Sequence, residues 1–525
     1  MDHDAHADSM DGRQELTGGG RRLFGGGPLG WLAALVFAGC GLYALIFVYH
    51  GARLVLYPFD VDNSEAYLVY QGMRLAEGEF LYPPLEEPPY LVDNYPPFYP
   101  ALTGLGFLFM PPNFHWPRLI SFLSTMATAA LAGYWVFLLT RRRSAGILSG
   151  LIYLSFYHVN DWGALARVDA LGAALAMGGL ILFEKTRSWK AALPLMACAL
   201  LTRQTLFAAP LAILAALLTS NEHKAALRYT GGLLTIGLIS GAALLLLSGG
   251  RAWSHLVIYN ANEYRLSDVM NYVNQWLRLY TVWGCAPLLI LVWRHPRLRP
   301  GSGDSSSQDR TSSLLFWFTL FALGEALMCG KIGSAPNYLL SLVAASCAGL
   351  GWIYHSFLEL AEEASIPEQR HILPLLVFLC ACALQLGSTW HWPHSRMVFS
   401  ETPTRQDAQQ VRWLANNLAR SKGPILSDRA GVALMAGHPP VFQPFILTQL
   451  IREGKWDPSI LLQRIRSREF LFVVLQFSLD DPNWDRERFT PDMIEALRES
   501  YALDRKLVRT GSRIVRYFLY KPKTP

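Results

Sequence analysis

The sequence predicts a polytopic α-helical membrane protein with a small α/β domain at its C-terminal end, and two observations lead to this fold class. Hydrophobic residues make up 52% of the 525 residues and charged residues only 16%, whereas soluble domains carry about 25% charged residues. The apolar residues gather in successive long runs, and the hydropathy falls only beyond about residue 389. This composition disfavours a soluble enzyme, and the abundance of aromatic residues disfavours a disordered or fibrous chain.

About eleven apolar runs are candidates for transmembrane helices, since a helix needs roughly 20 residues to cross a bilayer. They lie near residues 29–49, 117–139, 144–157, 169–184, 189–201, 204–219, 229–248, 278–294, 312–329, 336–358 and 372–388. Residues 1–28 are polar, glycine-rich and acidic, which is typical of a disordered tail. We therefore expect a transmembrane module over residues 29–388.

Basic residues in the short loops indicate the orientation of these helices. They cluster at 141–143, 185–190, 224–228 and 294–299, which are alternate loops of the predicted bundle. Cytoplasmic loops are enriched in Lys and Arg. The pattern predicts a multi-pass protein of the cytoplasmic membrane, with a cytoplasmic N-terminus and an extracytoplasmic C-terminal domain. Since the basic residues serve topology, the net charge of +6 predicts the lipid bilayer as a partner and no nucleic acid.

The long first external loop, residues 50–116, is the first place to look for function, because long loops are usually functional or disordered. Residues 60–93 hold eight acidic residues and one basic residue. Segments 64–77 and 97–110 are predicted to form helices at the membrane interface rather than spans, and prolines flank the second segment.

Residues 389–525 are predicted to form the extracytoplasmic α/β domain. Helical patterns at 404–420, 458–467 and 491–501 alternate with strand patterns, which lie at 424–427, 470–477, 506–509 and 514–520. Such alternation is typical of a small mixed domain.

Three acids follow the first span directly: Asp60, Asp62 and Glu65. Because they lie within six residues, we expect them to face one cleft. A carboxylate there can accept the proton of an attacking hydroxyl, or hold a divalent cation through its oxygens. The alternative is a solvated acidic loop in which Asn63 or Ser64 caps the next helix. The spacing leaves both hypotheses open, and with them the need for a metal.

Three further polar clusters lie at the predicted external ends of spans. They are Arg167 with Asp169, then Arg203 with Gln204, and then Lys331 with Asn337 and Tyr338. A guanidinium group binds phosphate through two hydrogen bonds. The alternatives are a structural ion pair for the first cluster and snorkelling to lipid headgroups for Arg203. Together the clusters put cations and carboxylates on one membrane face. No nucleotide-binding loop, zinc-protease motif or nucleophile elbow occurs, which disfavours nucleotide-driven and classical hydrolytic chemistry.

This arrangement resembles the GT-C superfamily of integral-membrane glycosyltransferases, and most of all its branch of dolichyl-phosphate-mannose and lipid-A aminoarabinose transferases. The resemblance covers roughly residues 30–390. It is carried by Asp60-x-Asp62-x-x-Glu65, Leu75-x-x-Gly78-x-x-x-Tyr82, Tyr95-Pro96-Pro97, Arg167-x-Asp169 and Thr202-Arg203-Gln204.

The resemblance implies an inverting glycosyltransferase whose donor is a sugar on a polyprenyl phosphate and whose acceptor is a lipid, a glycan or a protein. In that family a loop aspartate is the general base. Many members have adjacent Asp-Glu in this loop, whereas Asn63-Ser64 separates Asp62 from Glu65 here; we therefore favour Asp62, then Asp60. Together with the third polar cluster, this gives the expected substrate-binding residues: Tyr95, Arg167, Asp169, Arg203, Gln204, Lys331, Asn337 and Tyr338. Arg203 and Lys331 are expected to neutralise the leaving phosphate.

Two other functions compete with this hypothesis. A transporter or flippase is expected to bury ionisable residues near the membrane midplane and often to contain inverted repeats. Here the charges lie at the outer ends of spans and no repeat is visible, which favours the enzyme. An inactive scaffold that displays the C-terminal domain would not depend on the acids.

Overall fold

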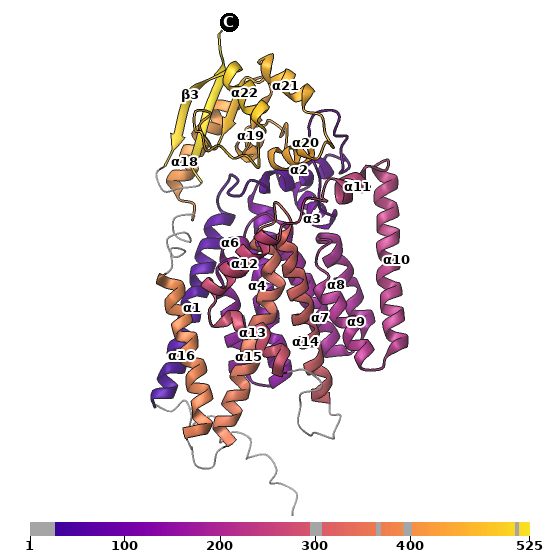
Figure 1. Cartoon of the computed structure of the whole chain (residues 1–525), viewed down its shortest axis with the longest axis vertical. Coiled ribbons are helices and arrows are strands. Elements are labelled where there is room, and N and C mark those ends of the chain that lie inside the picture. The colour runs from indigo at the N-terminus through magenta and orange to yellow at the C-terminus, as the bar shows by residue number, and fades with distance from the viewer. Residues whose placement is uncertain (1–26, 294–306, 364–368, 392–401, 510–513, 525) are drawn as a thin grey trace, which may run out of the picture.

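The computed structural model describes residues 27–293, 307–363, 369–391, 402–509 and 514–524. A helical bundle forms one end of the molecule and an α/β domain the other, with the loop of residues 50–116 between them (Figure 1). Most of the predicted polar tail and the basic loop at 294–299 lie outside the described residues.

The bundle has a helix at each predicted span. The helices are α1 (Pro28–Val55), α4 (His115–Thr140), α5 (Arg143–Ser155), α7 (Val168–Thr186), α8 (Trp189–Thr202), α9 (Ala208–Thr219), α10 (His223–Leu247), α13 (Ala286–Trp293), α14 (Ser307–Ala326), α15 (Leu340–Glu363) and α16 (Gln369–His391). In the described residues, six helices are long and apolar enough to cross a membrane, and the others are shorter. The total of eleven spans therefore stays a prediction.

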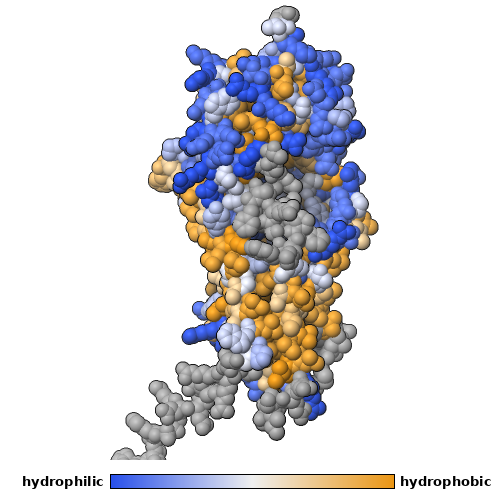
Figure 2. Space-filling view, turned by 90° about the vertical axis from the view of Figure 1, so that its left-hand side faces the viewer, coloured by the Kyte–Doolittle hydropathy of each residue, from blue (hydrophilic) through white to orange (hydrophobic). Residues whose placement is uncertain are grey.

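The bundle exposes apolar side chains on its outer surface. Leu234 and Leu238 of α10, for example, are 60% and 72% exposed. The visible face of the helical end is mostly hydrophobic, and the C-terminal domain is mostly hydrophilic (Figure 2). A large exposed apolar surface of this kind is stable in contact with lipid, not with water.

Local chemistry explains two helix ends. The helices α4 and α7 stop at Arg141 and Arg187, which have left-handed backbone conformations with φ of 56° and 55°. A left-handed residue after the last turn is a common helix terminator. Both arginines belong to basic loops, at 141–143 and 185–190, and these two loops lie at the end of the bundle away from the C-terminal domain (Figure 1).

The predicted span at 278–294 is interrupted. An amphipathic helix, α12 (Leu266–Leu279), ends there, a short 3₁₀ turn follows at Trp283–Cys285, and α13 has only eight residues. The exposed apolar residues of α12 recur every three or four positions: Leu266, Met270, Val273 and Leu277. A helix with one apolar face lies along a surface, so the expected loop at 250–277 is partly helical.

Both helices predicted in the loop of residues 50–116 are present, as α2 (Glu65–Ala76) and α3 (Phe98–Phe107). They can pack closely because both contact positions are glycines. A Cβ on Gly104 would lie only 2.8 Å from the carbonyl oxygen of Gly72. A third short helix, α6 (Tyr157–Trp162), lies near them at the same end of the bundle (Figure 1).

The C-terminal domain is the predicted α/β unit. Its sheet has the order β1-β2-β4-β3, in which β1 and β2 are parallel and the other pairs antiparallel. The strands are β1 (Ile425–Ser427), β2 (Phe472–Leu475), β3 (Tyr501–Val508) and β4 (Arg516–Pro522). The helices are α18 (Arg405–Leu418), α19 (Ala430–Met435), α20 (Pro444–Arg452), α21 (Ser459–Arg466) and α22 (Pro491–Ser500).

Both hydrophobic cores of this domain contain residues of the 50–116 loop. Val474 of β2 packs in a core with α18 that also contains Tyr57 and Phe59. Val473 and Leu475 point to the opposite face, as alternating strand residues must, into a core with α20, α21 and α22. This second core contains Leu85, Tyr90 and Val92 of the loop. The loop with the three acids is therefore packed against the C-terminal domain.

Candidate active site

Asp62 lies where two cavities meet. Its side chain is 28% exposed, and of the described residues only Asp62 and its neighbour Asn63 line both cavities. The carboxylate accepts hydrogen bonds from Arg167 Nη1 at 2.8 Å and from the backbone N–H of Ser64 at 3.0 Å, both on Oδ1. Asp62 is thus held in place and still partly open to both cavities.

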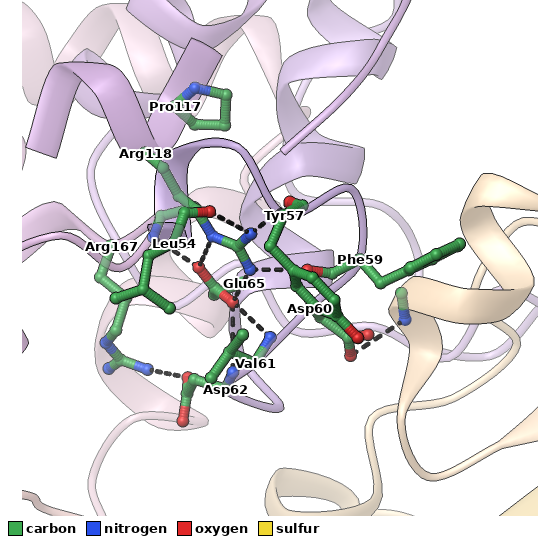
Figure 3. A network of polar contacts seen from close by, with 12 residues as sticks. Leu54, Tyr57, Phe59, Asp60, Val61, Asp62, Glu65, Pro117, Arg118 and Arg167 are labelled. Atoms are coloured by element: carbon green, nitrogen blue, oxygen red, sulfur yellow. Dashed lines mark hydrogen bonds and ion pairs between the residues drawn. The ribbon is translucent and has the colours of Figure 1, made fainter. Parts of the chain in front are cut away.

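Glu65 is fully buried, contacts the backbone N–H of Asp62, and lines neither cavity. It accepts hydrogen bonds from Arg118 Nε at 2.8 Å and Nη2 at 2.6 Å, and from the backbone N–H groups of Val61, Asp62 and Ala166 (Figure 3). Burial alone would raise the pKa of Glu65, but Arg118 and these donors lower it below the usual value. Glu65 therefore holds the loop as a buried carboxylate.

Arg118 completes this anchor from α4. Its Nη atoms donate to the carbonyl oxygens of Leu54, Tyr57 and Phe59 at 2.7–3.0 Å (Figure 3). One guanidinium thus binds both the end of α1 and the start of the loop. Nothing in the spacing of the sequence identified Arg118.

Asp60 is also fully buried, on the side of the C-terminal domain. Its Oδ2 lies 3.5 Å from Arg429 Nε and accepts a hydrogen bond from the N–H of Gly431 at 3.2 Å. Burial raises the pKa of Asp60. The expectation that the three acids face one cleft is therefore wrong, because Asp60 and Glu65 are each paired with a buried arginine and only Asp62 reaches the cavities.

The alternative of a solvated, helix-capping loop is wrong for these two acids as well. Ser64 occupies the N-cap position of α2, but its side chain makes no capping hydrogen bond. The three acids contact three different arginines, and within the described ranges no group of three His, Cys, Asp or Glu side chains is placed to hold a metal. The acids therefore do not fit the hypothesis of a shared divalent-cation site.

One of the two cavities, which we call the cationic cavity, has a volume of about 310 Å³. Seven predicted substrate-binding residues line it: Tyr95, Arg167, Arg203, Gln204, Lys331, Asn337 and Tyr338. The tertiary structure thus brings together clusters that lie more than 100 residues apart in sequence. The eighth predicted substrate-binding residue, Asp169, is buried and does not line the cavity itself.

Asp169 orients the cations of this wall. It accepts hydrogen bonds from Arg203 Nη1 at 2.7 Å and Asn337 Nδ2 at 2.9 Å, and its other oxygen lies 3.2 Å from Arg167 Nε. Arg203 also stacks on the ring of Tyr338, with 4.0 Å between the guanidinium carbon and the ring centre. The side chain of Arg203 is only 3% exposed, so the snorkelling alternative is wrong.

Lys331 is the third cation of the cavity. Its Nζ donates to Asn260 Oδ1 at 2.5 Å. Burial, reinforced by the positive charge of Arg203, lowers the pKa of Lys331 to about 8. Its ammonium group therefore changes charge near neutral pH, unlike the guanidinium groups beside it.

Sequence reasoning missed the part of the cationic cavity that the C-terminal domain supplies. Arg488, Asp485 and Glu487 line it, and Arg488 Nη1 also donates to Gln476 Oε1 at 3.2 Å. The sequence around these residues carries no motif. Their role in the cavity depends on the docking of the C-terminal domain.

The other cavity, which we call the α6 cavity, has a volume of about 450 Å³. Besides Asp62, its polar lining includes His50 of α1, Asn160 and Asp161 of α6, and Arg516 of β4. The aromatic side chains of Tyr157 and Trp162 also line it. Its lining has one Lys or Arg residue, Arg516, whereas the cationic cavity has four: Arg167, Arg203, Lys331 and Arg488.

Comparison with known proteins gives the same fold. No family model and no curated protein sequence matches the chain. The crystal structure of ArnT from Cupriavidus metallidurans bound to undecaprenyl phosphate superposes with a TM-score of 0.58 at 13% identity, over 94% of this chain and 98% of that one. The apo form of ArnT gives 0.55 at 12% identity, over 94% and 97%.

This match extends over both the bundle and the C-terminal domain. The chain therefore has the GT-C fold that the resemblance predicted, and it is a multi-pass membrane protein with a small C-terminal α/β domain. At this identity the likeness establishes the fold alone; the chemistry has to be argued from the residues of the site.

Proposed function

Starting from the GT-C fold, we propose that this chain is an inverting glycosyltransferase that moves a sugar from a polyprenyl-phosphate donor to an acceptor, at the extracytoplasmic face of the cytoplasmic membrane. The observation that carries the proposal is the position of Asp62 between two cavities of different chemistry. A general base must lie within hydrogen-bond reach of the acceptor hydroxyl, and that hydroxyl must also face the donor, so a base is best placed where the two substrate sites meet.

The cationic cavity is the proposed donor site. Arg167, Arg203 and Lys331 lie around it. They match the single negative charge that the two non-bridging oxygens of a phosphodiester share, and the second charge that develops when the phosphate leaves. Undecaprenyl phosphate bound to ArnT, a protein of the same fold, supports a polyprenyl phosphate as the carrier. The bundle beside the cavity exposes the apolar surface on which a polyprenyl chain would lie.

The α6 cavity is the proposed acceptor site. A hydroxyl group there attacks the anomeric carbon of the donor sugar, and Asp62 accepts the hydroxyl proton. The bond from the anomeric carbon to the phosphate oxygen breaks as the new glycosidic bond forms, and its electrons leave with the polyprenyl phosphate. In the proposed arrangement the anomeric carbon lies between the acceptor in one cavity and the phosphate in the other, so attack comes from the side opposite the leaving group and inverts the anomeric centre.

The distribution of charge supports the proposed orientation. The basic loops after α4, α7 and α9 lie at the end of the bundle away from the C-terminal domain (Figure 1), and cytoplasmic loops are the basic ones. The transporter alternative has less support, because Asp62 and the cations around it line a cavity that the C-terminal domain also lines, and not one in the middle of the bundle.

The test uses purified protein reconstituted in vesicles and a panel of labelled polyprenyl-phosphate sugars as donors. Turnover is measured as the release of the polyprenyl-phosphate carrier. Asp62→Asn keeps the shape of the side chain and removes the base, so we expect a rate about 10²–10⁴-fold lower. Glu77→Gln, an exposed acid at the end of α2, is the matched control. Equal turnover in the two variants would refute the base assignment.

A further inference from the structure

We infer that the C-terminal domain is part of the catalytic centre, because its residue Arg429 positions the backbone that carries Asp62. This inference rests on the proposed function in one respect, that Asp62 is the base. Arg429 lies just before α19, is fully buried, and lines neither cavity. It is therefore a positioning residue and not a catalytic one.

Arg429 joins the domain to the loop through its guanidinium. Within the domain, Nη1 donates to the carbonyl oxygen of Ile514 at 2.9 Å, and the ring of Tyr517 lies 5.4 Å away. Toward the loop, Nη2 donates to the carbonyl oxygens of Asp60 at 2.6 Å and Val61 at 3.2 Å. These are the two carbonyl groups that directly precede Asp62.

The same stretch of backbone is held from the other side. The N–H groups of Val61 and Asp62 donate to Glu65 Oε2 at 2.7 and 3.1 Å, and Glu65 is fixed by Arg118 of the bundle. The peptide group between Val61 and Asp62 thus has its oxygen bound by the C-terminal domain and its N–H bound through the bundle. Two partners on one peptide plane fix the direction in which the Asp62 side chain leaves the backbone.

The contact at Asp60 is too close for an ordinary packed surface. A Cβ on Gly431 would lie 2.3 Å from the Asp60 carboxyl group, so only glycine fits there. A buried ion pair contributes little net stability, because desolvation offsets the attraction. An apolar contact would join the loop to the domain without this desolvation cost. The pair between Asp60 and Arg429 therefore indicates that the contact serves to orient the loop.

The domain is also docked at a second place, which allows the inference to be tested cleanly. Tyr90 pairs with the segment around Phe442: its N–H donates to Val441 O at 2.8 Å, and its carbonyl accepts from Gln443 N at 3.2 Å. Removing the Arg429 contact therefore leaves this attachment in place.

The experiment compares full-length wild type with Arg429→Lys and with the double variant Arg429→Gln/Asp60→Asn, which leaves no unpaired charge at the contact. The turnover rate is divided by the measured concentration of donor-binding sites, so that unfolded protein does not lower the value. Because a displacement of about 1 Å costs around 100-fold in rate, we expect kcat about 100-fold lower in the double variant, with unchanged donor affinity. Arg429→Lys should recover part of the loss, since an ammonium group still reaches one carbonyl. Arg412→Gln, on the exposed face of α18, is the control.

A second measurement does not depend on turnover. Amide hydrogen exchange of the peptide over residues 57–66 should be at least tenfold faster in the double variant, and exchange over residues 85–92 should be unchanged. Wild-type kcat per donor site together with unchanged exchange over residues 57–66 would overturn the inference. Faster exchange with no turnover in the wild type would instead refute the proposed function and leave the positioning role standing.

Discussion

Replacement of Glu65 by Gln should destabilise the fold far more than it affects any chemical step. Glu65 Oε1 accepts from Arg118 Nε and the Ala166 N–H, and Oε2 accepts from Arg118 Nη2 and the N–H groups of Val61 and Asp62. The amide nitrogen of Gln must take the place of one oxygen. Either two or three of these five hydrogen bonds are then replaced by contacts between two donors.

The magnitude follows from the burial of the pair. Both side chains are 0% exposed, and removing one partner of a buried pair costs about 3–5 kcal/mol. For a chain of 525 residues each kcal/mol lowers the unfolding midpoint by about 1 °C, so we expect a decrease of roughly 3–5 °C. Since Arg118 and the backbone donors hold the pKa of Glu65 below its usual value, this stabilisation is present at neutral pH and is lost as the pH falls through that lowered pKa.

The assay is thermal unfolding of the detergent-solubilised protein, followed by tryptophan fluorescence. Glu77→Gln serves as control, since Glu77 is exposed at the other end of α2. A wild-type midpoint for Glu65→Gln, combined with a large loss of kcat, would refute this reasoning and place Glu65 in the chemistry.

Three further predictions concern the donor site and the topology. Arg203→Lys should weaken donor binding and Arg203→Gln should weaken it more, because a point charge cannot replace a guanidinium that stacks on Tyr338; donor titration curves for Arg203→Lys that match wild type would remove Arg203 from the site. Lys331 carries its charge below a pKa of about 8, so donor affinity should fall about tenfold between pH 7 and 9, and Lys331→Arg should abolish this dependence. In a background without native cysteines, a cysteine at Asp481 should be labelled in intact cells and one at Asn221 only after permeabilisation; the reverse pattern would invert the proposed orientation.

Much of the fold could be predicted from local sequence, because each element depends on its own residues. Apolar runs predicted the bundle helices, and proline and the polar pattern predicted α2 and α3. Alternating elements predicted three helices and all four strands of the C-terminal domain, but not its helices α19 and α20. The strand expected at 506–509 begins at Tyr501, since an exposed strand lacks a strong apolar pattern. The span expected at 278–294 is interrupted because a run of apolar residues does not reveal where a helix breaks.

The sequence also identified the three acids as candidate site residues, but only the tertiary structure distinguishes their roles. Six residues of irregular loop can point side chains in any direction, so the spacing of Asp60, Asp62 and Glu65 says nothing about which one meets a cavity. The answer depends on Arg118, 53 residues from Glu65, and on Arg429, 369 residues from Asp60. Each guanidinium buries one carboxylate by neutralising it, because an unpaired charge cannot be taken out of water; Asp62, whose arginine lies at the cavity wall, stays partly exposed.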